Sequence, residues 1–230
     1  MQVSKRIYSI CGHLKGRKLA DIGTDHCHLP IFAINSGKTD YAIGVDVKER
    51  PLKSARDNVA LSGLTEKIEL RLGDGFSPIE PGEVDSAVIS GMGGVLISAI
   101  IEKGLAKALE LKELILSPQS DFSLLRKNLH RLGFEIFNED IIKDGGKFYP
   151  LIMARSGKDS EYGGFDYDFG KIMLNRPTDD FYEYLEELWK RNENIRINNP
   201  LTEDKKAVIL ERNRFIRDFC KKPNMSEEGG

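Results

Sequence analysis

The chain alternates short apolar runs with stretches in which apolar residues recur three or four positions apart, which is the spacing of a helix. The predicted strands are residues 19–22, 41–45, 68–72, 86–89 and 114–116, and the predicted helices are residues 29–36, 51–62, 95–109 and 122–132. Strands and helices in this order require crossover connections. The pattern therefore predicts an open α/β sheet of mostly parallel strands, covered by helices on both faces.

Both ends of this region carry a further element. Val3, Ile7, Ile10 and Leu14 share one face of a predicted basic N-terminal helix. After Gly133, a predicted helix C-cap, the runs 134–142 and 148–154 flank an Asp-Gly-Gly turn and predict an antiparallel hairpin. Among nucleotide-type folds, a parallel sheet with this ending is typical of Rossmann-like, class I methyltransferases, an inference made by analogy between folds.

The polar, glycine-rich segment 156–164 predicts a domain boundary. Beyond it, residues 178–194 and 202–219 have helical patterns and are separated by Asn198-Asn199-Pro200. So short a connection predicts an antiparallel, coiled-coil-like helical hairpin. The expected organisation is a methyltransferase domain over 1–157, a helical hairpin over 165–222 and a disordered tail over 223–230.

Composition adds to this picture. At 230 residues and 40% hydrophobic, the chain can bury a substantial core. Its longest apolar stretch, 95–101, is too short to span a bilayer, and the N-terminus lacks the apolar region of a secretory signal. The three cysteines, Cys11, Cys27 and Cys220, imply no disulfide framework. We expect a soluble, cytoplasmic protein that does not contact a membrane.

The formal net charge of -2 hides an uneven distribution. Residues 1–19 carry five basic side chains and no acidic one, and residues 205–222 carry seven basic and two acidic ones. A solvated helix face explains such runs, but two basic ends beside a catalytic crevice also suit a phosphate backbone. The residues expected to contact RNA phosphates are Lys5, Arg6, Lys15, Arg17, Lys205, Arg212 and Arg217.

Acidic residues follow three predicted strands: Asp21 and Asp25 at the first, Asp46 at the second and Asp74 at the third. The carboxyl ends of parallel strands share one edge of a sheet, so these acids should line a crevice there. The first turn has only Gly23 instead of G-x-G-x-x-G, which disfavours a dinucleotide and suits S-adenosylmethionine, a cationic cofactor without phosphate. The structural alternative is that each acid caps a helix or occupies a turn.

Asp46 is placed to accept hydrogen bonds from ribose hydroxyls, and Asp74 to receive an adenine amino group. The glycines after the fourth strand imply close backbone approach to a ligand or a neighbouring strand. The full set expected at the cofactor is Asp21, Gly23, Thr24, Asp25, His26, Asp46, Val47, Asp74, Gly75, Gly91, Met92 and Gly93.

Other chemistries have little support. His26, Cys27 and His28 are adjacent and cannot easily all ligate one ion, and no C-x-x-C or H-E-x-x-H occurs. No metal is therefore expected. The nucleophile elbow G-x-S-x-G and the phosphate loop G-x-x-x-x-G-K are also missing from the sequence.

Together these motifs resemble the bacterial tRNA (adenine-N1) methyltransferases of the TrmK type, which modify the adenine at tRNA position 22. The resemblance rests on residues 20–26 with Leu29-Pro30, on 91–94, on 114–116 with Pro118, and on Gly146-Lys147 with Tyr149. The chain departs from the family at His28, where the family has an aromatic residue, and at Gln119, where it has asparagine. The resemblance implies a class I fold, S-adenosylmethionine as cofactor, and a helical hairpin that assists tRNA binding.

Methyl transfer to adenine N1 needs little base catalysis because N1 is an uncharged lone-pair nucleophile, so alignment and exclusion of water should dominate. A carboxylate near the purine would stabilise the positive charge that develops; Asp25 is the first candidate and Asp121 the second. Gln119 is a candidate for contact with the base, although Pro118 also fits a plain turn in which Ser120 or Asp121 caps the next helix. The base must be unpaired, and Tyr149 or Phe148 is placed to stack on it.

Three alternatives remain open at this stage. A small-molecule methyltransferase would have the same cofactor crevice but no salt-sensitive tRNA complex. An inactive RNA-binding protein would fail to bind S-adenosylmethionine. A nicotinamide oxidoreductase would bind NAD. No protein partner is required by any feature of the sequence.

Overall fold

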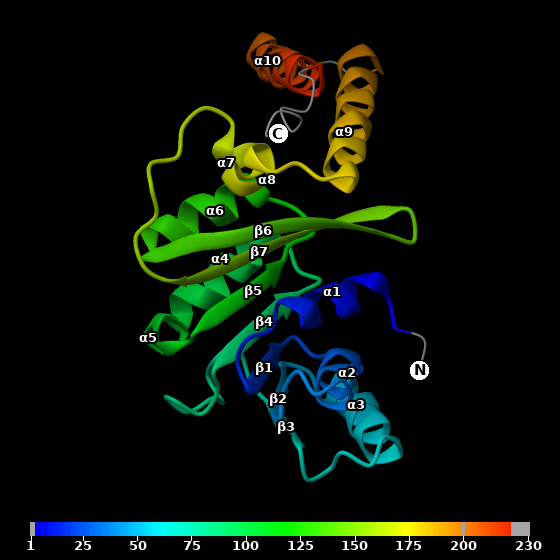
Figure 1. Ribbon diagram of the computed structural model, residues 1–230, viewed down its shortest axis with the longest axis vertical. Helices are drawn as coiled ribbons and strands as arrows, with labels where there is room; N and C mark the ends of the chain where they lie inside the picture. Colours follow the sequence, from blue (N-terminus) through cyan, green and yellow to red (C-terminus); the bar gives the residue numbers. More distant parts are fainter. Residues whose placement is uncertain (1–2, 199–200, 222–230) are drawn as a thin grey trace, which may run out of the picture. The chain divides into compact units, whose positions relative to one another are not determined.

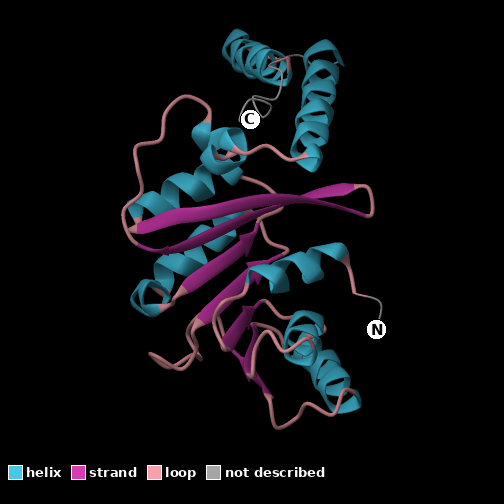
Figure 2. Cartoon of the chain, in the orientation of Figure 1, coloured by secondary structure: helices cyan, strands magenta, loops and turns pink. Residues whose placement is uncertain are grey.

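A seven-stranded, mostly parallel sheet forms the centre of the first part of the chain (Figures 1 and 2). The computed structural model describes residues 3–198 and 201–221. The strands are β1 (Lys18–Ile22), β2 (Tyr41–Asp46), β3 (Ile68–Leu72), β4 (Ser86–Ser90), β5 (Glu113–Ser117), β6 (Phe134–Asp144) and β7 (Lys147–Ser156). Their order is β3-β2-β1-β4-β5-β7-β6, with β7 antiparallel to β5. The predicted parallel sheet with a terminal antiparallel hairpin is confirmed.

Helices cover both faces of the sheet, as the alternating pattern predicts (Figure 1). One face carries α1 (Lys5–His13), α2 (His28–Asn35) and α3 (Glu49–Leu61), and the other carries α4 (Gly94–Lys103), α5 (Leu105–Glu110) and α6 (Phe122–Arg131). The single helix expected over 95–109 is two helices, because Gly104 ends α4 where the chain passes close to Phe76. A Cβ on Gly104 would lie 2.7 Å from the Cβ of Phe76.

Each face of the sheet has its own apolar core. Phe76, Ile97 and Leu125 belong to the core under α4 to α6, and Ile10 and Ala55 belong to the core under α1 to α3. Because helices cover both faces of the sheet, the inner strands β1, β4 and β5 are buried almost throughout, as expected for parallel strands. These two cores fix the strand ends that form the crevice.

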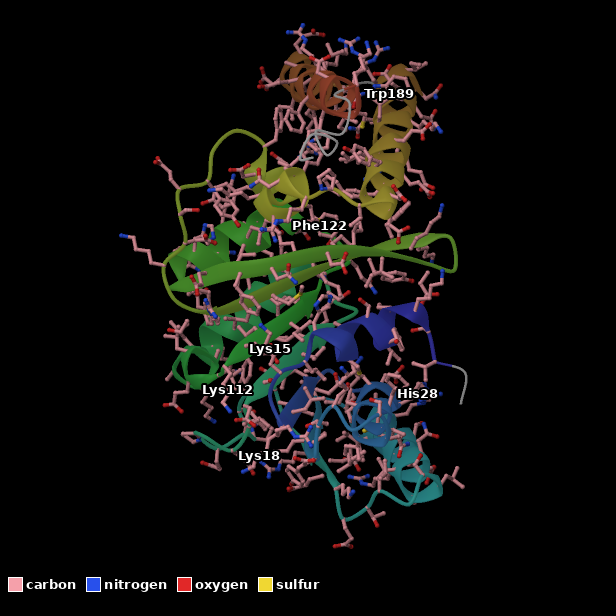
Figure 3. The ribbon with its side chains drawn as sticks, in the orientation of Figure 1. Lys15, Lys18, His28, Lys112, Phe122 and Trp189 are labelled. Atoms are coloured by element: carbon pink, nitrogen blue, oxygen red, sulfur yellow. The ribbon has the colours of Figure 1, made fainter. Side chains whose placement is uncertain are left out.

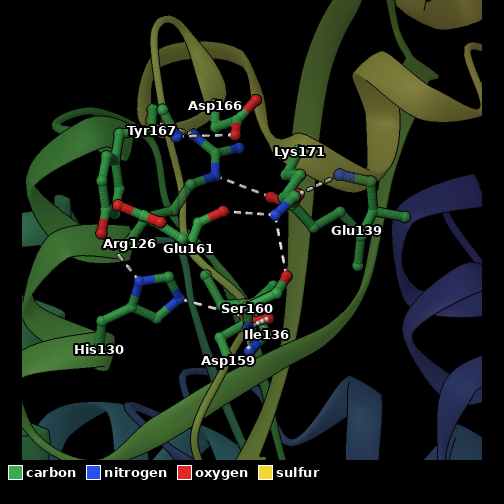
Figure 4. Close-up of polar contacts among 12 residues, drawn as sticks. Arg126, His130, Ile136, Glu139, Asp159, Ser160, Glu161, Asp166, Tyr167 and Lys171 are labelled. Atoms are coloured by element: carbon green, nitrogen blue, oxygen red, sulfur yellow. Dashed lines mark hydrogen bonds and ion pairs between the residues drawn. The ribbon is translucent and has the colours of Figure 1, made fainter.

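The domain boundary differs from the one expected at 156–164. The chain divides into two compact units, residues 1–176 and 177–230, so α7 (Asp166–Phe169) and α8 (Lys171–Asn175) belong to the first unit. The reason is a buried ion pair between Arg126 on α6 and Glu139 on β6, 2.7 Å apart (Figure 4). Arg126 also donates to the carbonyl oxygen of Tyr167, and Glu139 accepts from the backbone N–H of Ile172.

A histidine adds a second tie to this segment (Figure 4). The two ring nitrogens of His130 on α6 lie 3.0 Å from the hydroxyl of Tyr167 and 3.2 Å from the Asp159 carboxylate. A polar, glycine-rich linker is thus held by side chains whose partners are distant in sequence, which composition alone does not reveal.

The second unit contains α9 (Asp179–Asn198) and α10 (Glu203–Cys220). The ring of Phe181 at the start of α9 contacts that of Phe219 at the end of α10, and the Asn192 amide donates to Asn213 Oδ1 at 2.9 Å. The two helices therefore run in opposite directions, as predicted. The tail expected to be disordered, residues 223–230, lies outside the described residues.

No helix within residues 3–198 and 201–221 is long and apolar enough to cross a membrane.

Candidate active site

A cavity of about 370 Å³ opens at the carboxyl edge of the parallel strands, where the sequence predicts a crevice. It is surrounded by residues from α1, the start of α2, the ends of β1, β2 and β4, and the turns after β1, β4 and β5. They are Arg6, Ile7, Ile10, Asp21, Gly23, Asp25, His26, Cys27, His28, Leu29, Asp46, Ser90, Gly91, Met92 and Gln119. Chain segments more than 100 residues apart thus meet at one site.

The turn after β1 is fixed to the end of β2. The backbone N–H groups of Gly23 and Thr24 both donate to the carbonyl oxygen of Val45, at 2.8 and 2.9 Å. Gly23 has φ +82°, a conformation that favours glycine. A Cβ there would lie 2.1 Å from Met92 Cε, so a side chain at this position would displace the end of the Met92 side chain. At Gly23 the cavity wall therefore consists of backbone atoms only.

Asp21 is the buried acid of the site, with 7% of its surface exposed. Burial raises the pKa of its carboxyl to about 6, and the nearby Asp46 charge acts in the same direction, while the Arg6 charge lowers it. A cationic ligand beside Asp21 would stabilise the ionised carboxylate, so the site favours ligands with positive charge.

Asp25, His26 and His28 form the exposed rim of the cavity. The Asp25 carboxylate lies 3.4 Å from His26 Nε2, and the rings of His26 and His28 stack with centroids 5.5 Å apart. Burial, followed by the neighbouring His26, lowers the pKa of His28. Between the two histidines, the backbone of Cys27 is in the left-handed region with φ 58°, and its side chain is buried. Burial raises the pKa of the Cys27 thiol to about 12, so this thiol is not a reactive thiolate.

Asp46 ends β2, and its Oδ1 accepts a hydrogen bond from the backbone N–H of Lys48 at 2.8 Å. The helix-capping alternative for this acid is wrong, because Lys48 is the N-cap of α3 and no side chain caps that helix. Asp46 lines the cavity with Asp21 and Asp25. Three carboxylates around one cavity make it suited to a ligand that carries cationic and hydroxyl groups.

The turns after β4 and β5 bind each other. Gly91 N–H donates to the carbonyl oxygen of Ser117, and Gln119 N–H donates to that of Met92 at 2.9 Å. A Cβ on Gly94 would lie 2.6 Å from the carbonyl oxygen of Asp121, so this glycine is required by a neighbouring loop. At Gly91, by contrast, a Cβ would have only Gln119 Nε2 within 4 Å, so this glycine leaves space in the cavity wall.

Several expected cofactor residues do not line this cavity. Asp74 and Gly75 line a separate hollow of about 180 Å³, where the Asp74 carboxylate binds Lys103 Nζ at 2.6 Å. Val47 is exposed and Thr24 is buried, and neither lines the cavity. Of the remaining candidates, Gly93, Pro118 and Asp121 are also outside the cavity lining.

Asp121 lies beside the site, at the start of α6. It has φ 56° and precedes the helix, and its carboxylate accepts a hydrogen bond from Ser120 Oγ at 2.6 Å. Asp121 is therefore the N-cap residue of α6, as the alternative prediction states. Its side chain, however, makes no capping hydrogen bond to this helix.

The basic residues expected at RNA are divided between the two edges of the sheet. Arg6 lines the cavity, and its guanidinium lies 4.9 Å from the centroid of the Tyr149 ring. Arg17 is at the opposite edge, paired with Asp40, and Lys15 lies near Phe137 with its N–H bound to Glu113. Figure 3 shows His28 on the other side of the sheet from Lys18 and Lys112, which mark that opposite edge.

Lys5 is exposed on the first turn of α1. The other three candidates, Lys205, Arg212 and Arg217, lie on α10 of the second unit; Lys205 and Arg217 are exposed and Arg212 is half-buried.

Sequence reasoning missed six lining residues: Ile7, Ile10, Cys27, His28, Leu29 and Ser90. Ser90 ends β4, so the rule that places ligands at strand ends was sufficient to find it. The two isoleucines lack such a signal, because their place depends on how α1 packs beside α2. Within the described part of the chain, no group of three His, Cys, Asp or Glu side chains could hold a metal ion.

The chain is similar to methyltransferases. A family model described as a methyltransferase domain matches residues 3–152. The tRNA (adenine(22)-N(1))-methyltransferase of Bacillus subtilis (strain 168) is 34% identical over 175 residues, which are 75% of this chain and 74% of that protein.

Solved structures share the whole architecture. One is a Streptococcus pneumoniae protein assigned as a tRNA (m1A22) methyltransferase and solved in complex with S-adenosyl-L-methionine. It is 31% identical to this chain with a TM-score of 0.87, and the match covers 95% of this chain and 100% of that chain. The B. subtilis M1A22 tRNA methyltransferase TrmK is 27% identical with a TM-score of 0.83, over 95% of this chain and 99% of that chain.

Proposed function

The chain belongs to the methyltransferase-domain family and, within it, to the tRNA (adenine(22)-N(1))-methyltransferases, and from this premise we propose that it transfers a methyl group from S-adenosylmethionine to N1 of the adenine at tRNA position 22. The observation that carries the proposal is the crevice at the carboxyl edge, where carboxylates of β1, β2 and the first turn surround a cavity open to the loops after β4 and β5.

The residues of the crevice fit S-adenosylmethionine, which supplies a methyl group on a sulfonium when bound. Asp21, Asp25 and Asp46 complement its cationic groups, and Asp46 is placed at the end of the second strand to accept from ribose hydroxyls. Gly23 and Gly91 leave backbone at the wall of the cavity, while the single glycine in the first turn provides no cradle for a pyrophosphate.

Transfer to N1 depends on alignment more than on proton removal, because the neutral ring nitrogen is itself the nucleophile. The bonded loops after β4 and β5 hold the Gln119 side chain at the cavity, where its amide can contact a polar base edge. Asp25 is the carboxylate proposed to stabilise the positive charge that methylation places on the purine, and this role is electrostatic. Asp121 lies outside the cavity lining and is the second candidate.

The adenine must leave any base pair before its N1 can enter the crevice. Tyr149, whose ring lies against the Arg6 guanidinium, is proposed to stack on the base. Lys5, Arg6 and the basic residues of α10 are proposed to contact the phosphate backbone. Because tRNA is its substrate, we place the enzyme in the cytoplasm.

Incubation of the protein with bulk unmodified tRNA and methyl-labelled S-adenosylmethionine, followed by nucleoside analysis, tests the proposal. We expect the label in 1-methyladenosine. Label that stays in the cofactor fraction, or that enters another nucleoside, would overturn it. An Asp46→Ala variant is the matched control for dependence on the crevice.

A further inference from the structure

Arg6 belongs to two surfaces of the first unit at once. Its side chain is half-buried and lines the cavity together with Asp21, Asp25 and Asp46. Its guanidinium also lies 4.9 Å from the centroid of the ring of Tyr149, which belongs to β7. One basic side chain of α1 therefore contacts both the crevice proposed for the cofactor and the aromatic ring proposed to receive the base.

The backbone that carries Arg6 is fixed. α1 packs against both α2 and β6 (Figure 1), and the Asp144 carboxylate accepts the Arg6 backbone N–H at 3.2 Å. At the other end of this helix, His13 Nε2 lies 3.4 Å from the Asp140 carboxylate. A change of charge in the cavity therefore acts on the long, flexible side chain of Arg6 and leaves α1 in its place.

The charged groups that line the cavity do not balance one another. Asp21, Asp25 and Asp46 supply three carboxylates, and Arg6 is the only lysine or arginine among the described residues of the lining. The Arg6 charge lowers the pKa of Asp21, whereas the Asp46 charge raises it. When no cofactor is bound, Arg6 is thus the group that partly neutralises the acids of the crevice.

A cationic cofactor competes with Arg6 for these carboxylates. The ammonium and sulfonium groups of S-adenosylmethionine bring positive charge beside the acids, and this charge also repels the guanidinium. Arg6 is then held less strongly in the crevice and is available to a phosphate, the group that arginine binds well through paired hydrogen bonds. S-adenosylhomocysteine has a neutral sulfur, so it displaces Arg6 less.

We propose that Arg6 couples the charge of the bound cofactor to the affinity of the enzyme for tRNA. With a cationic cofactor in the crevice, the Arg6 side chain turns from the carboxylates to a phosphate of the tRNA. With S-adenosylhomocysteine it stays with the carboxylates. The enzyme therefore binds tRNA most tightly when it has a methyl group to transfer. The inference rests on the proposed function, because it assumes that S-adenosylmethionine and tRNA are the substrates.

Binding of a tRNA transcript in the presence of sinefungin or of S-adenosylhomocysteine tests the proposal without turnover. Neither molecule can transfer a methyl group, and sinefungin carries a protonated amine where the cofactor carries its sulfonium methyl. We expect the unchanged protein to bind the transcript about tenfold more tightly with sinefungin than with S-adenosylhomocysteine. The variant Arg6→Gln should bind it with the same affinity, within about twofold, in both cases. Arg6→Lys retains the charge and should keep a difference of about threefold.

Arg131→Gln is the matched control. Arg131 is an exposed arginine on α6 that pairs with Glu102, and it does not line the cavity. This variant should keep the difference of about tenfold between the two molecules.

Cofactor binding without tRNA separates coupling from damage to the fold. Arg6→Gln should prefer sinefungin over S-adenosylhomocysteine about threefold more strongly than the unchanged protein does, because no guanidinium repels the amine. A structural role of Arg6 would weaken the binding of both molecules alike, and that result would contradict the proposal.

Methylation of tRNA by the unchanged protein is measured alongside. If the protein methylates tRNA but binds the transcript equally well with sinefungin and S-adenosylhomocysteine, the coupling by Arg6 is wrong while the proposed function stands. A difference of about tenfold that persists in Arg6→Gln would also overturn the coupling. If the unchanged protein methylates no tRNA, the proposed function is wrong and the coupling falls with it.

Discussion

Gly23 and Met92 approach each other so closely that a Cβ on Gly23 would lie 2.1 Å from Met92 Cε. The first residue belongs to the turn after β1 and the second to the turn after β4, and both line the cavity. The two turns that define the crevice are therefore in direct contact, and the shape of the cavity depends on a glycine at position 23.

The change Gly23→Ala tests this contact. Its left-handed backbone should cost about 1–3 kcal/mol of unfolding free energy, and displacement of Met92 should weaken S-adenosylmethionine binding at least about tenfold. Gly37→Ala is the matched control, because Gly37 has φ +69° with nothing within 4 Å of an added Cβ. It should lose stability but keep its cofactor affinity. Equal cofactor affinity in the two variants, measured by calorimetry, would show that the Gly23 contact does not shape the site.

Asp46→Ala should weaken S-adenosylmethionine binding about tenfold or more and leave tRNA binding largely intact, since the carboxylate lines the cavity at the end of β2. Asp40→Ala is the control: Asp40 lies next to the other end of β2 and pairs with Arg17 at the opposite edge of the sheet. Isothermal titration with the cofactor gives both affinities. An unchanged affinity in Asp46→Ala would remove this residue from the site.

Asp21 predicts a pH dependence. Burial raises the pKa of its carboxyl to about 6 in the folded chain from the ordinary aspartate pKa of 3.8, so the folded state binds more protons than the unfolded state between these two pH values. The contribution of Asp21 to unfolding free energy therefore falls as pH rises from about 4 to about 6, by up to about 3 kcal/mol. The variant Asp21→Asn has no carboxyl that titrates at this position. In urea unfolding, its unfolding free energy minus that of the unchanged protein should therefore rise as pH rises from about 4 to about 6. A constant difference between the two proteins would contradict the assignment.

The pair Arg126 and Glu139 should dominate the stability of the first unit, since both side chains are at most 1% exposed. Arg126→Leu leaves a buried carboxylate without its partner and should lower unfolding free energy by about 3–5 kcal/mol. The double change Arg126→Leu with Glu139→Leu should recover part of that loss. A double variant as unstable as the sum of its single variants would show that the two residues act independently.

Charge reversal at Lys205, Arg212 and Arg217 tests the second unit. These residues lie on α10, and we expect weaker, less salt-sensitive tRNA binding with little change in cofactor affinity. Filter binding at two salt concentrations measures the effect. If tRNA binding is the same as in the unchanged protein, the helical hairpin has a structural role or contacts other proteins.

Local pattern predicted most of the fold. Apolar periodicity identified every strand of the parallel sheet, and Asp144-Gly145-Gly146 located the hairpin, because these signals lie within short stretches of chain. Two features escaped it. The helix expected over 95–109 breaks at Gly104 because of the distant Phe76, and the boundary moves to residue 176 because Arg126 and Glu139 bind the linker.

The lining of the cavity was predicted where strand ends determine it. Asp21, Asp25 and Asp46 all line the cavity, as their positions after β1 and β2 indicated. Asp74 also follows a strand, but it is paired with Lys103 in a neighbouring hollow. The basic charge near the N-terminus predicted the site less well. Of the basic candidates there, Arg6 lines the cavity, whereas Arg17 lies at the opposite edge of the sheet.

The most direct test of the account uses two tRNA transcripts that differ only at position 22, one with adenine and one with guanine, each incubated with the protein and S-adenosylmethionine. The account predicts one added methyl group on the first transcript, located at N1 of residue 22 by mass spectrometry of its fragments, and none on the second. Equal methylation of both transcripts, or of neither, would contradict it.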